Sequence, residues 1–338
     1  MKQSWQNRLT AITGGAGFIG SNLAKALVRR GARVRIVDNL ERGRLDNLVE
    51  IREQVEFIHA DLRTPEAARA CLTGVDVVFH LAAQVGGIKV YLDKAGSVLN
   101  NNLLIDQNVF AAAVELKTPK LFYASSAHVY PGRLQQSPDA PALKEDDADP
   151  AEPILTYGWG KRIGEITLLS LAAECPWMNV SIARIMGAYG YNQDITLETG
   201  SVIPVFCHRA IIWPERSPFR IWGTGAETRS YVFIDDVVEG ILQSITLDQN
   251  RNITGPFNLA AEGRATIHDL ANRIIALSGK SIPIELSPSP TAIWGQAADC
   301  SFATGLLNGW HAQVSLDDGL SKTYSDIRRQ LSQSGHIR

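Results

Sequence analysis

The stretch Leu9-Thr10-Ala11-Ile12-Thr13-Gly14-Gly15-Ala16-Gly17-Phe18-Ile19-Gly20, near the start of a 338-residue chain, decides the fold. Its first five residues are apolar or β-branched and predict a strand. The glycines at 14, 17 and 20 predict a tight turn that leads directly into a helix. In such a turn Gly14 permits the bend, Gly17 lets the backbone approach a pyrophosphate, and Gly20 lets helix and strand pack closely. The helix N-terminus adds free N–H groups and partial positive charge. The stretch therefore predicts a dinucleotide site that includes Phe18 and Ile19.

Short apolar runs alternate with helical patterns over the following residues. The runs predict strands at 34–38, 55–59, 75–81 and 121–125, and helices are expected at 22–30 and 100–115. Strand–helix alternation favours a doubly wound parallel sheet, the Rossmann type of α/β fold. After about residue 185, frequent Pro and Gly predict a smaller, mixed α/β lobe. We therefore expect a cofactor domain at 1–185 and a substrate lobe at 186–338, with some segments of the second returning to the first. The Pro- and acid-rich segment 135–153 is expected to be an exposed loop.

Composition excludes several classes of partner. Lys plus Arg total 33 and Asp plus Glu total 35, so the net charge of −2 gives no basic surface for nucleic acid or anionic membranes. No apolar run is long enough to span a bilayer, and the polar start Met1–Trp5 lacks the core of a secretion signal. The four cysteines are far apart and lack metal-site spacing, so we expect buried free thiols, no metal and a cytoplasmic location. They are Cys71, Cys175, Cys207 and Cys300.

An acidic residue follows the glycine loop at the distance that a dinucleotide site requires. Asp38 ends the second predicted strand, 18 residues beyond Gly20, where its carboxylate can accept hydrogen bonds from both ribose hydroxyls. It would repel a 2′-phosphate, so NAD is favoured over NADP, although Arg42 and Arg44 could soften this preference. The ends of the neighbouring strands complete the expected cofactor site, with room for a base edge and for the cofactor itself. These further positions are Asn39, Asp61, Leu62, Leu81, Ala82 and Ala83.

A second group of residues predicts acid–base chemistry. Tyr157 and Lys161 are four residues apart, so on a helix they share a face, and the ammonium should lower the pKa of the phenol. Such a phenol can accept a proton from a substrate hydroxyl. Ser126 follows the fifth predicted strand, where its hydroxyl can bond the reacting oxygen, and His128 is a candidate proton donor or acceptor. The alternatives are a tyrosine packed on a lysine stem at the surface, and a histidine that only bonds the backbone.

Together these motifs resemble the extended short-chain dehydrogenase/reductase family, which contains nucleotide-sugar epimerases, dehydratases and reductases. The stretch His80-Leu81-Ala82-Ala83 and the segment Gly223–Tyr231 are also similar to that family. The resemblance implies that Arg229 grips a diphosphate and that Asn102 supports the cofactor site. It further implies substrate contacts from Gln84, Gly86, Gly87, Ser126 and His128, and a cofactor contact from Lys161.

Within the family, the chain is most similar to the branch of GDP-mannose 3,5-epimerases and GDP-fucose synthases, whereas the stretch from Asp38 to Gly43 is more like UDP-sugar 4-epimerases. Several positions depart from that branch. His128 replaces an acid/base cysteine, and Ser201 or Val202 stands where a second acid/base is found. Gly187 replaces a substrate-contacting asparagine, and Gln296 a late arginine. Ala127-His128 replaces the Asp-Glu pair of 4,6-dehydratases, which argues against dehydration.

These features predict an NAD-dependent nucleotide-sugar epimerase. Tyr157 would take a hydroxyl proton, NAD would accept and return hydride, and a keto-sugar would form in between. The alternative is an NAD(P)-dependent nucleotide-sugar reductase or dehydrogenase of the GDP-fucose-synthase type, although Asp38 counts against NADPH. A non-catalytic NAD-binding scaffold is a third possibility. The resemblance also implies a homodimer through the helices near 100–115 and 157–173.

Overall fold

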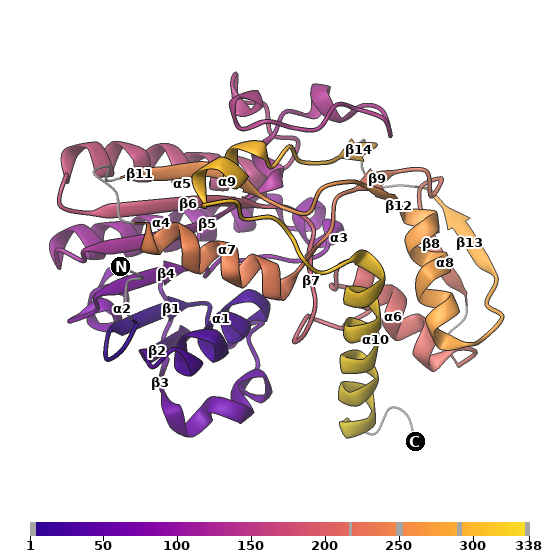
Figure 1. The fold of residues 1–338 in the computed structure, drawn as a ribbon, viewed down its shortest axis with the longest axis horizontal. Coiled ribbons are helices and arrows are strands. Elements are labelled where there is room, and N and C mark those ends of the chain that lie inside the picture. The colour runs from indigo at the N-terminus through magenta and orange to yellow at the C-terminus, as the bar shows by residue number, and fades with distance from the viewer. Residues whose placement is uncertain (1–4, 216–217, 248–252, 289–292, 335–338) are drawn as a thin grey trace.

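The computed structural model describes residues 5–215, 218–247, 253–288 and 293–334. Within them, a seven-stranded parallel sheet has the order β11-β6-β5-β4-β1-β2-β3 (Figure 1). The strand order reverses beside β1, and ligands of such sheets bind at this switch point, beyond the carboxyl ends of the strands. The strands are β1 (Leu9–Thr13), β2 (Arg33–Asp38), β3 (Val55–His59), β4 (Val77–His80), β5 (Lys120–Ser126), β6 (Asn179–Ile185) and β11 (Ile253–Leu259). The expected Rossmann fold is confirmed.

Helices cover both faces of this sheet, which explains why a central strand such as β4 is buried on both sides. In β4, Val77 and Phe79 belong to one core cluster and Val78 to another, because successive side chains point to opposite faces. The first face carries α1 (Phe18–Arg29) and α7 (Ile234–Thr246), and the second carries α2 (Pro65–Leu72), α4 (Ala95–Glu115) and α5 (Thr156–Glu174).

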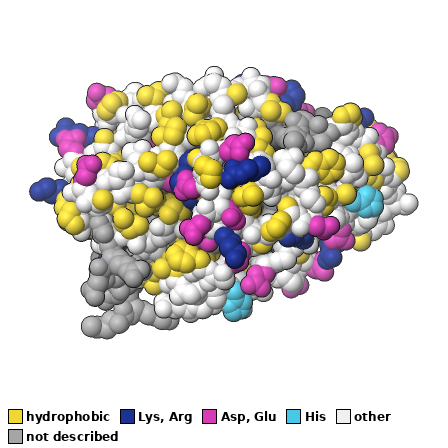
Figure 2. Space-filling model, turned by 90° about the horizontal axis from the view of Figure 1, so that it is seen from above, with side chains coloured by type: hydrophobic (Ala, Val, Ile, Leu, Met, Phe, Trp, Pro, Cys, Tyr) yellow, Lys and Arg dark blue, Asp and Glu magenta, His cyan; other side chains and the backbone are white. Residues whose placement is uncertain are grey.

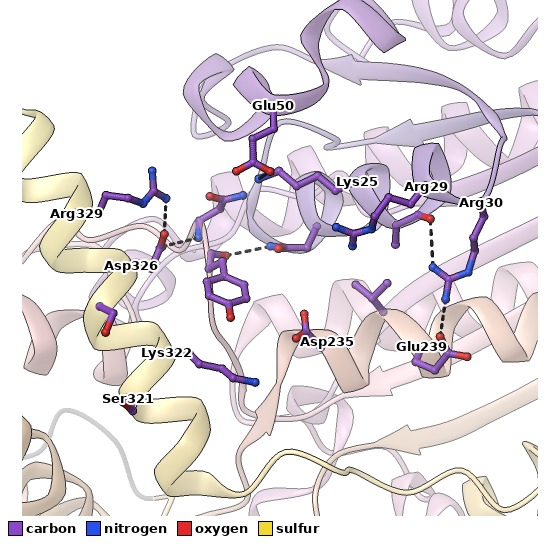
Figure 3. Close-up of a pocket in the computed structure, with 16 residues that line it drawn as sticks. Lys25, Arg29, Arg30, Glu50, Asp235, Glu239, Ser321, Lys322, Asp326 and Arg329 are labelled. Atoms are coloured by element: carbon purple, nitrogen blue, oxygen red, sulfur yellow. Dashed lines mark hydrogen bonds and ion pairs between the residues drawn. The ribbon is translucent and has the colours of Figure 1, made fainter.

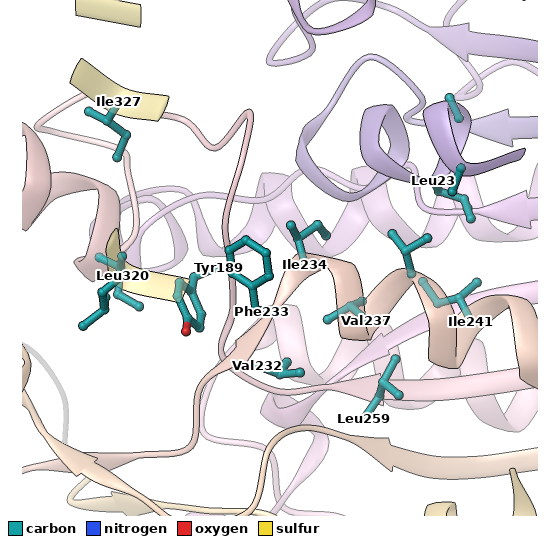
Figure 4. Packing of buried hydrophobic residues seen from close by; sticks show 14 of the residues in the cluster. Leu23, Tyr189, Val232, Phe233, Ile234, Val237, Ile241, Leu259, Leu320 and Ile327 are labelled. Atoms are coloured by element: carbon teal, nitrogen blue, oxygen red, sulfur yellow. The ribbon is translucent and has the colours of Figure 1, made fainter. Parts of the chain in front are cut away.

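The second lobe is smaller and is continuous with the first core. Figure 4 shows Leu23 of α1, Ile241 of α7 and Leu320 of the last helix within one cluster of buried side chains. Two elements from beyond residue 185, α7 and β11, complete the parallel sheet and its cover. The lobe itself consists of α6 (Val202–Ile212), α8 (Ile267–Ser278), α10 (Leu316–Gln333) and small sheets, whereas α9 (Ser301–Leu306) packs beside β11 of the parallel sheet (Figure 1). These sheets pair β7 (Ala188–Tyr189) with β10 (Val232–Phe233), β8 (Phe219–Trp222) with β13 (Ile284–Ser287), and β9 (Thr228–Arg229) with β12 (Ala265–Thr266) and β14 (Gly295–Gln296).

Short helical elements fill the connections. They are α3 (Ile88–Asp93) and the 3₁₀ segments Leu45–Gln54, Ala127–Val129, Gly132–Gln135 and Glu145–Ala148. The expectation of an exposed loop at 135–153 is wrong in part, because Leu143 and Ala148 are buried beside Tyr130. This segment is tied to the sheet by Glu145, whose carboxylate accepts a hydrogen bond from the Asn258 N–H at 2.7 Å.

The cysteines and the surface also bear on the expectations from sequence. All four cysteines are free thiols, but Cys175 is only partly buried, so the expectation of burial fails for that residue. Acidic and basic side chains are interspersed on the face shown in Figure 2, with no field of one sign. In the part of the chain that the structure describes, no helix combines the length and apolar character needed to cross a membrane. Of the polar start, Met1–Ser4 lie outside the described residues.

Candidate active site

The glycine loop between β1 and α1 forms a cradle that side chains would fill. Gly14 has a φ of +68°, and a Cβ there would lie 2.9 Å from the backbone of Ala82. A Cβ on Gly20 would lie 2.3 Å from the carbonyl oxygen of Gly14. α1 begins at Phe18, four residues earlier than expected, and its N-cap, Gly17, has no capping side chain. The first N–H groups of α1 therefore remain available to an anion, as a pyrophosphate site requires.

A cavity of about 450 Å³ extends from this loop along the carboxyl ends of the strands. Asp38 stands at the end of β2 and is 8 % exposed. Its two carboxylate oxygens accept hydrogen bonds from the N–H groups of Ala16, at 3.0 Å, and Leu40, at 2.9 Å. Burial raises the pKa of Asp38. The predicted positions that line this cavity are Gly14, Gly17, Phe18, Ile19, Gly20, Asp38, Asn39, Asp61, Leu62, Leu81, Ala82, Ala83 and Lys161.

The basic residues near Asp38 are already engaged. Arg42 forms an ion pair with Asp194 of the second lobe, and Arg44 pairs with Asp46 at 3.3 Å. Both guanidinium groups therefore already contact a carboxylate, and neither is left unpaired for a 2′-phosphate. Asp61 is itself paired with Arg63, whose hydrogen bonds hold the pKa of that carboxyl below its usual range. The cradle and the Asp38 carboxylate thus fit an adenine dinucleotide without a 2′-phosphate.

Asn102 and Gln84 are joined by hydrogen bonds beside the cofactor cavity. Asn102 is buried beneath the cavity and does not line it. Its side chain accepts a hydrogen bond from the Gln84 N–H at 2.6 Å and donates one to the Gln84 carbonyl at 3.1 Å. Asn102 therefore fixes the backbone after β4. Gln84, predicted as a substrate contact, lies instead in the cofactor cavity and accepts a hydrogen bond from the Asn101 amide at 3.0 Å.

The predicted acid–base residues converge at the inner end of this cavity. Ser126 ends β5, and its hydroxyl accepts a hydrogen bond from the His128 N–H at 3.2 Å. Tyr157 and Lys161 lie one turn apart on α5, and the hydroxyls of Tyr157 and Ser126 are hydrogen-bonded. The Lys161 ammonium lies 4.5 Å from the centre of the Tyr123 ring.

The expected effect of Lys161 on the phenol is wrong for the protein alone. Burial and the neighbouring Tyr91 hold the pKa of Tyr157 well above its ordinary value, although the bond to Ser126 opposes this shift. Burial removes the water that would solvate a phenolate, and this loss of solvation dominates over the attraction expected from the ammonium. Burial likewise lowers the pKa of Lys161, against the attraction of Asp106 and Glu165. Tyr157 is therefore a neutral phenol in this structure.

Tyr91 is the principal site residue that the sequence analysis missed. Its ring is stacked on that of Tyr157, with centroids 4.7 Å apart and planes at 16°. The His128 ring meets both tyrosines edge-on, at 5.8 Å and 5.6 Å. Tyr91 comes from the short helix α3 and belongs to no motif, so only the three-dimensional arrangement identifies it.

A second cavity, of about 380 Å³, adjoins the first. The two share five lining residues at their junction: Tyr91, His128, Gly187, Ala188 and Ser201. The predicted substrate residues Gly86, Gly87, His128 and Arg229 line the second cavity. Arg229 donates hydrogen bonds to the carbonyls of Thr228, at 2.7 Å, and Ile293, at 3.0 Å, so its guanidinium is anchored at the wall.

The departures from the family pattern have structural explanations at this junction. Gly187 has a φ of +61°, and a Cβ there would lie 2.0 Å from the carbonyl oxygen of Ser230, so no larger residue fits. The Ser201 hydroxyl accepts a hydrogen bond from Gln193 at 3.3 Å. Gln296 donates to the Gln135 side chain at 2.8 Å. Burial and Arg229 lower the pKa of His128 to about 4, so its imidazole is neutral at pH 7.

A larger hollow, of about 990 Å³, lies between α1, α7 and α10 and contains none of the predicted site residues. Figure 3 shows that charged side chains surround it, and several of them neutralise one another. Lys25 pairs with Glu50 at 3.1 Å and Arg30 with Glu239 at 2.8 Å. In the described ranges, no group of three or more His, Cys, Asp or Glu residues is arranged to hold a metal ion.

The parallel sheet, the glycine cradle, Asp38 and the Tyr157/Lys161 pair define the class of enzymes that use a nicotinamide dinucleotide. Residues 10–260 match the model of the NAD dependent epimerase/dehydratase family. The chain belongs to this family, and NAD is its cofactor.

Relatives and solved structures agree with this assignment. The chain is 31 % identical to GDP-mannose 3,5-epimerase of Arabidopsis thaliana, over 98 % of this chain and 85 % of the relative. It is 30 % identical to UDP-glucuronic acid decarboxylase 1 of the same plant, over 95 % and 70 %. Among solved structures, UDP-glucose 4-epimerase of Thermotoga maritima superposes with a TM-score of 0.84 at 25 % identity, over 96 % and 99 % of the two chains. UDP-glucuronic acid 4-epimerase of Bacillus cereus, solved with UDP-glucuronic acid and NAD, gives 0.81 at 27 %, over 95 % and 99 %.

Proposed function

We propose that this chain is a nucleotide-sugar epimerase that acts through a transient keto-sugar and reuses its NAD. The observation that carries the proposal is the junction of the two cavities. Tyr157 lines the cofactor cavity, and His128 and Tyr91 line both cavities at the point where they meet. A sugar held there would have Tyr157, the proposed acceptor of its hydroxyl proton, on one side and the cofactor site on the other.

The residues of the chain divide the chemistry between them. NAD, when bound, supplies a ring carbon that accepts hydride from the sugar and returns it. Tyr157, once ionised, takes the proton of the sugar hydroxyl and becomes a neutral phenol, which gives the proton back when the keto group is reduced. Ser126, whose hydroxyl stabilises the Tyr157 phenolate, orients the same oxygen. Because burial disfavours this phenolate in the protein alone, Tyr157 has to lose its own proton before it can act as a base, and positive charge on Lys161 would favour that loss.

The outer part of the second cavity supports a nucleotide diphosphate as the rest of the substrate. Arg209, Arg220 and Arg229 line it, and they provide positive charge for phosphate oxygens. Trp222, 45 % exposed, also lines it and offers an aromatic face to a base. Relatives and solved neighbours named for GDP- and UDP-linked sugars support this substrate class.

His128 decides which kind of inversion the site performs. Because burial and Arg229 lower the pKa of His128 to about 4, the imidazole is neutral at pH 7 and has a free lone pair, but it is a weaker base than an exposed histidine. Next to a keto group it can remove an acidified carbon-bound proton, but the second acid/base position holds Ser201. We expect His128→Ala to spare inversion at the oxidised carbon itself and to abolish deuterium uptake from D₂O at a neighbouring carbon. Full uptake in this variant would exclude His128 as the base.

A panel of GDP-, UDP- and dTDP-sugars, followed by NMR and by absorbance at 340 nm, tests the proposed function. We expect one sugar nucleotide to give an epimer with no net change in absorbance. Stoichiometric consumption or formation of NAD(P)H would indicate the reductase alternative. Binding of sugar nucleotides with no product from any of them would indicate a scaffold.

We also propose that the protein forms a homodimer through α4 and α5. Three exposed apolar side chains of α5 lie at helical spacing on one face: Trp159 is 40 % exposed, Ile163 36 % and Ile166 49 %. Leu104 of the neighbouring α4 is 39 % exposed. Apolar side chains gathered on adjacent helices favour a protein–protein contact.

A further inference from the structure

A buried polar chain connects the cofactor loop to the catalytic helix. The Thr13 hydroxyl, at the end of β1, lies 2.7 Å from Nδ1 of His80, and Nε2 of His80 lies 3.0 Å from Oδ1 of Asp106. The Tyr123 hydroxyl donates to Oδ2 of Asp106 at 2.5 Å. The Lys161 ammonium lies over the Tyr123 ring at 4.5 Å. Five elements, β1, β4, α4, β5 and α5, thus contribute to one network.

The donors that contact Asp106 within this network are neutral. Burial lowers the pKa of His80, so its ring carries no charge and donates through Nε2. Burial and Asp106 raise the pKa of Tyr123 far above its ordinary value. Asp106 is 2 % exposed, and a buried acidic side chain that already accepts these neutral hydrogen bonds gains further from a nearby positive charge.

Two buried carboxyl groups, Asp106 and Glu165, act on Lys161 and oppose the effect of burial on its pKa, but Glu165 is already paired with arginines. Glu165, on the same helix, accepts hydrogen bonds from Arg162 at 2.8 Å and from Arg184 at 2.8 Å. Lys161, only 2 % exposed, therefore needs a separate counter-ion.

The packing of α5 brings Lys161 to Asp106. Gly164 is three residues from Lys161, so the two share a face of the helix. A Cβ on Gly164 would lie 2.2 Å from the Tyr123 hydroxyl and 2.8 Å from Oδ2 of Asp106. A glycine at this position thus lets the Lys161 face of α5 close onto Tyr123 and Asp106.

We propose that Asp106 is the counter-ion of Lys161, held at the hydroxyl end of the Tyr123 ring, and is a positioning residue for Tyr157. The proposal rests on the proposed function only in taking Tyr157 and Lys161 as the acid–base pair. Asp106 keeps Lys161 charged in a buried site and at the same time opposes loss of the Tyr157 proton. The network thereby holds a charged lysine beside a neutral phenol until the substrate binds.

The test measures the pKa of Lys161 directly, by NMR titration of the unliganded protein labelled with ¹³C at the lysine ε-carbons. Lys161→Gln identifies the resonance. In Asp106→Asn we expect the pKa of Lys161 to fall by about one or more, because its nearest unshared negative charge is lost. In Tyr123→Phe, which keeps the carboxylate, we expect a much smaller fall.

An unchanged pKa of Lys161 in folded Asp106→Asn would overturn the proposal, as would an equal fall in Tyr123→Phe. If Asp106→Asn does not fold, Asp106→Ser removes the same charge with a smaller side chain. An unchanged pKa of Lys161 in that variant, or an equal fall in Tyr123→Phe, would again overturn the proposal. Activity is measured separately. A fall in the pKa together with no epimerisation by the wild-type protein would preserve the counter-ion and refute the proposed function.

Discussion

Replacing Asp38 by Asn tests how the site selects its cofactor. In the structure the two carboxylate oxygens accept one backbone N–H each, from Ala16 and Leu40, and Asp38 lines the cofactor cavity. Asn keeps one acceptor oxygen and loses the charge. A hydrogen bond to a charged group contributes about 1.5–3 kcal/mol. We therefore expect NAD to bind Asp38→Asn about 10- to 150-fold more weakly.

The same substitution should weaken NADP less than NAD, because the charge that repels a 2′-phosphate is gone. The NH₂ group of the asparagine would also point at one of the two backbone N–H groups, so that two donors oppose each other. This costs about 1–3 kcal/mol of folding free energy. Calorimetric titration of cofactor-free protein with NAD and with NADP measures both affinities, and thermal denaturation measures the stability. Asp139→Asn is the matched control, since Asp139 is exposed and does not line the cofactor cavity, so no change is expected.

The pH dependence of cofactor binding follows from the same group. Burial raises the pKa of Asp38, so its carboxylate protonates at a higher pH than an exposed aspartate would. NAD binding favours the ionised form, and affinity should therefore fall as the pH drops through this raised pKa. Equal NAD affinities for Asp38→Asn and wild type, or a wild-type preference for NADP, would refute the reasoning.

Three further changes test the catalytic pair, the junction and the oligomer. Tyr157→Phe should lower turnover about 10²- to 10⁴-fold and leave NAD affinity intact, since the stacked ring remains; turnover within tenfold of wild type would exclude this base. Gly187→Ala should lower stability by about 1–3 kcal/mol in denaturant titrations, because its Cβ would overlap a carbonyl, and an unaffected protein would show that the backbone adapts. Ile166→Glu should convert a dimer to a monomer in sedimentation experiments, whereas a monomeric wild type would disprove the proposed contact.

The sequence predicted the features that depend on local patterns. The glycine spacing, Asp38 and the strand ends are set by backbone requirements that recur wherever a strand leads into a phosphate-binding helix, so the fold and the cofactor are recovered. The segment 135–153 does not match the expected exposed loop, because Leu143 and Ala148 pack into a core cluster formed by residues that follow distant strands, which its prolines and acids do not reveal.

Features that depend on packing between distant segments were not predictable from one sequence. Tyr91, on the short helix α3, stacks on Tyr157 of α5. Asp106, on α4, contacts Tyr123 of β5 and His80 of β4. The pKa of Tyr157 depends on how completely the folded chain excludes water, so counting nearby charges gave the wrong sign. The spacing of residues in the sequence identifies candidate acid–base groups, whereas the solvation that sets their pKa depends on how the folded site is packed.

The most direct test of the account labels the hydrogen that the cofactor site must hold. The substrate found in the sugar-nucleotide panel is prepared with deuterium on the carbon that undergoes inversion and is converted by the wild-type protein in ordinary water. If NAD oxidises and reduces again the carbon that is inverted, the product retains the deuterium there; if His128 exchanges the hydrogen of a carbon next to the keto group, the deuterium is lost but reduced cofactor still forms transiently at 340 nm. Loss of the deuterium to solvent with no transient absorbance at 340 nm would contradict the account, because inversion would then proceed by proton exchange without transfer to the cofactor.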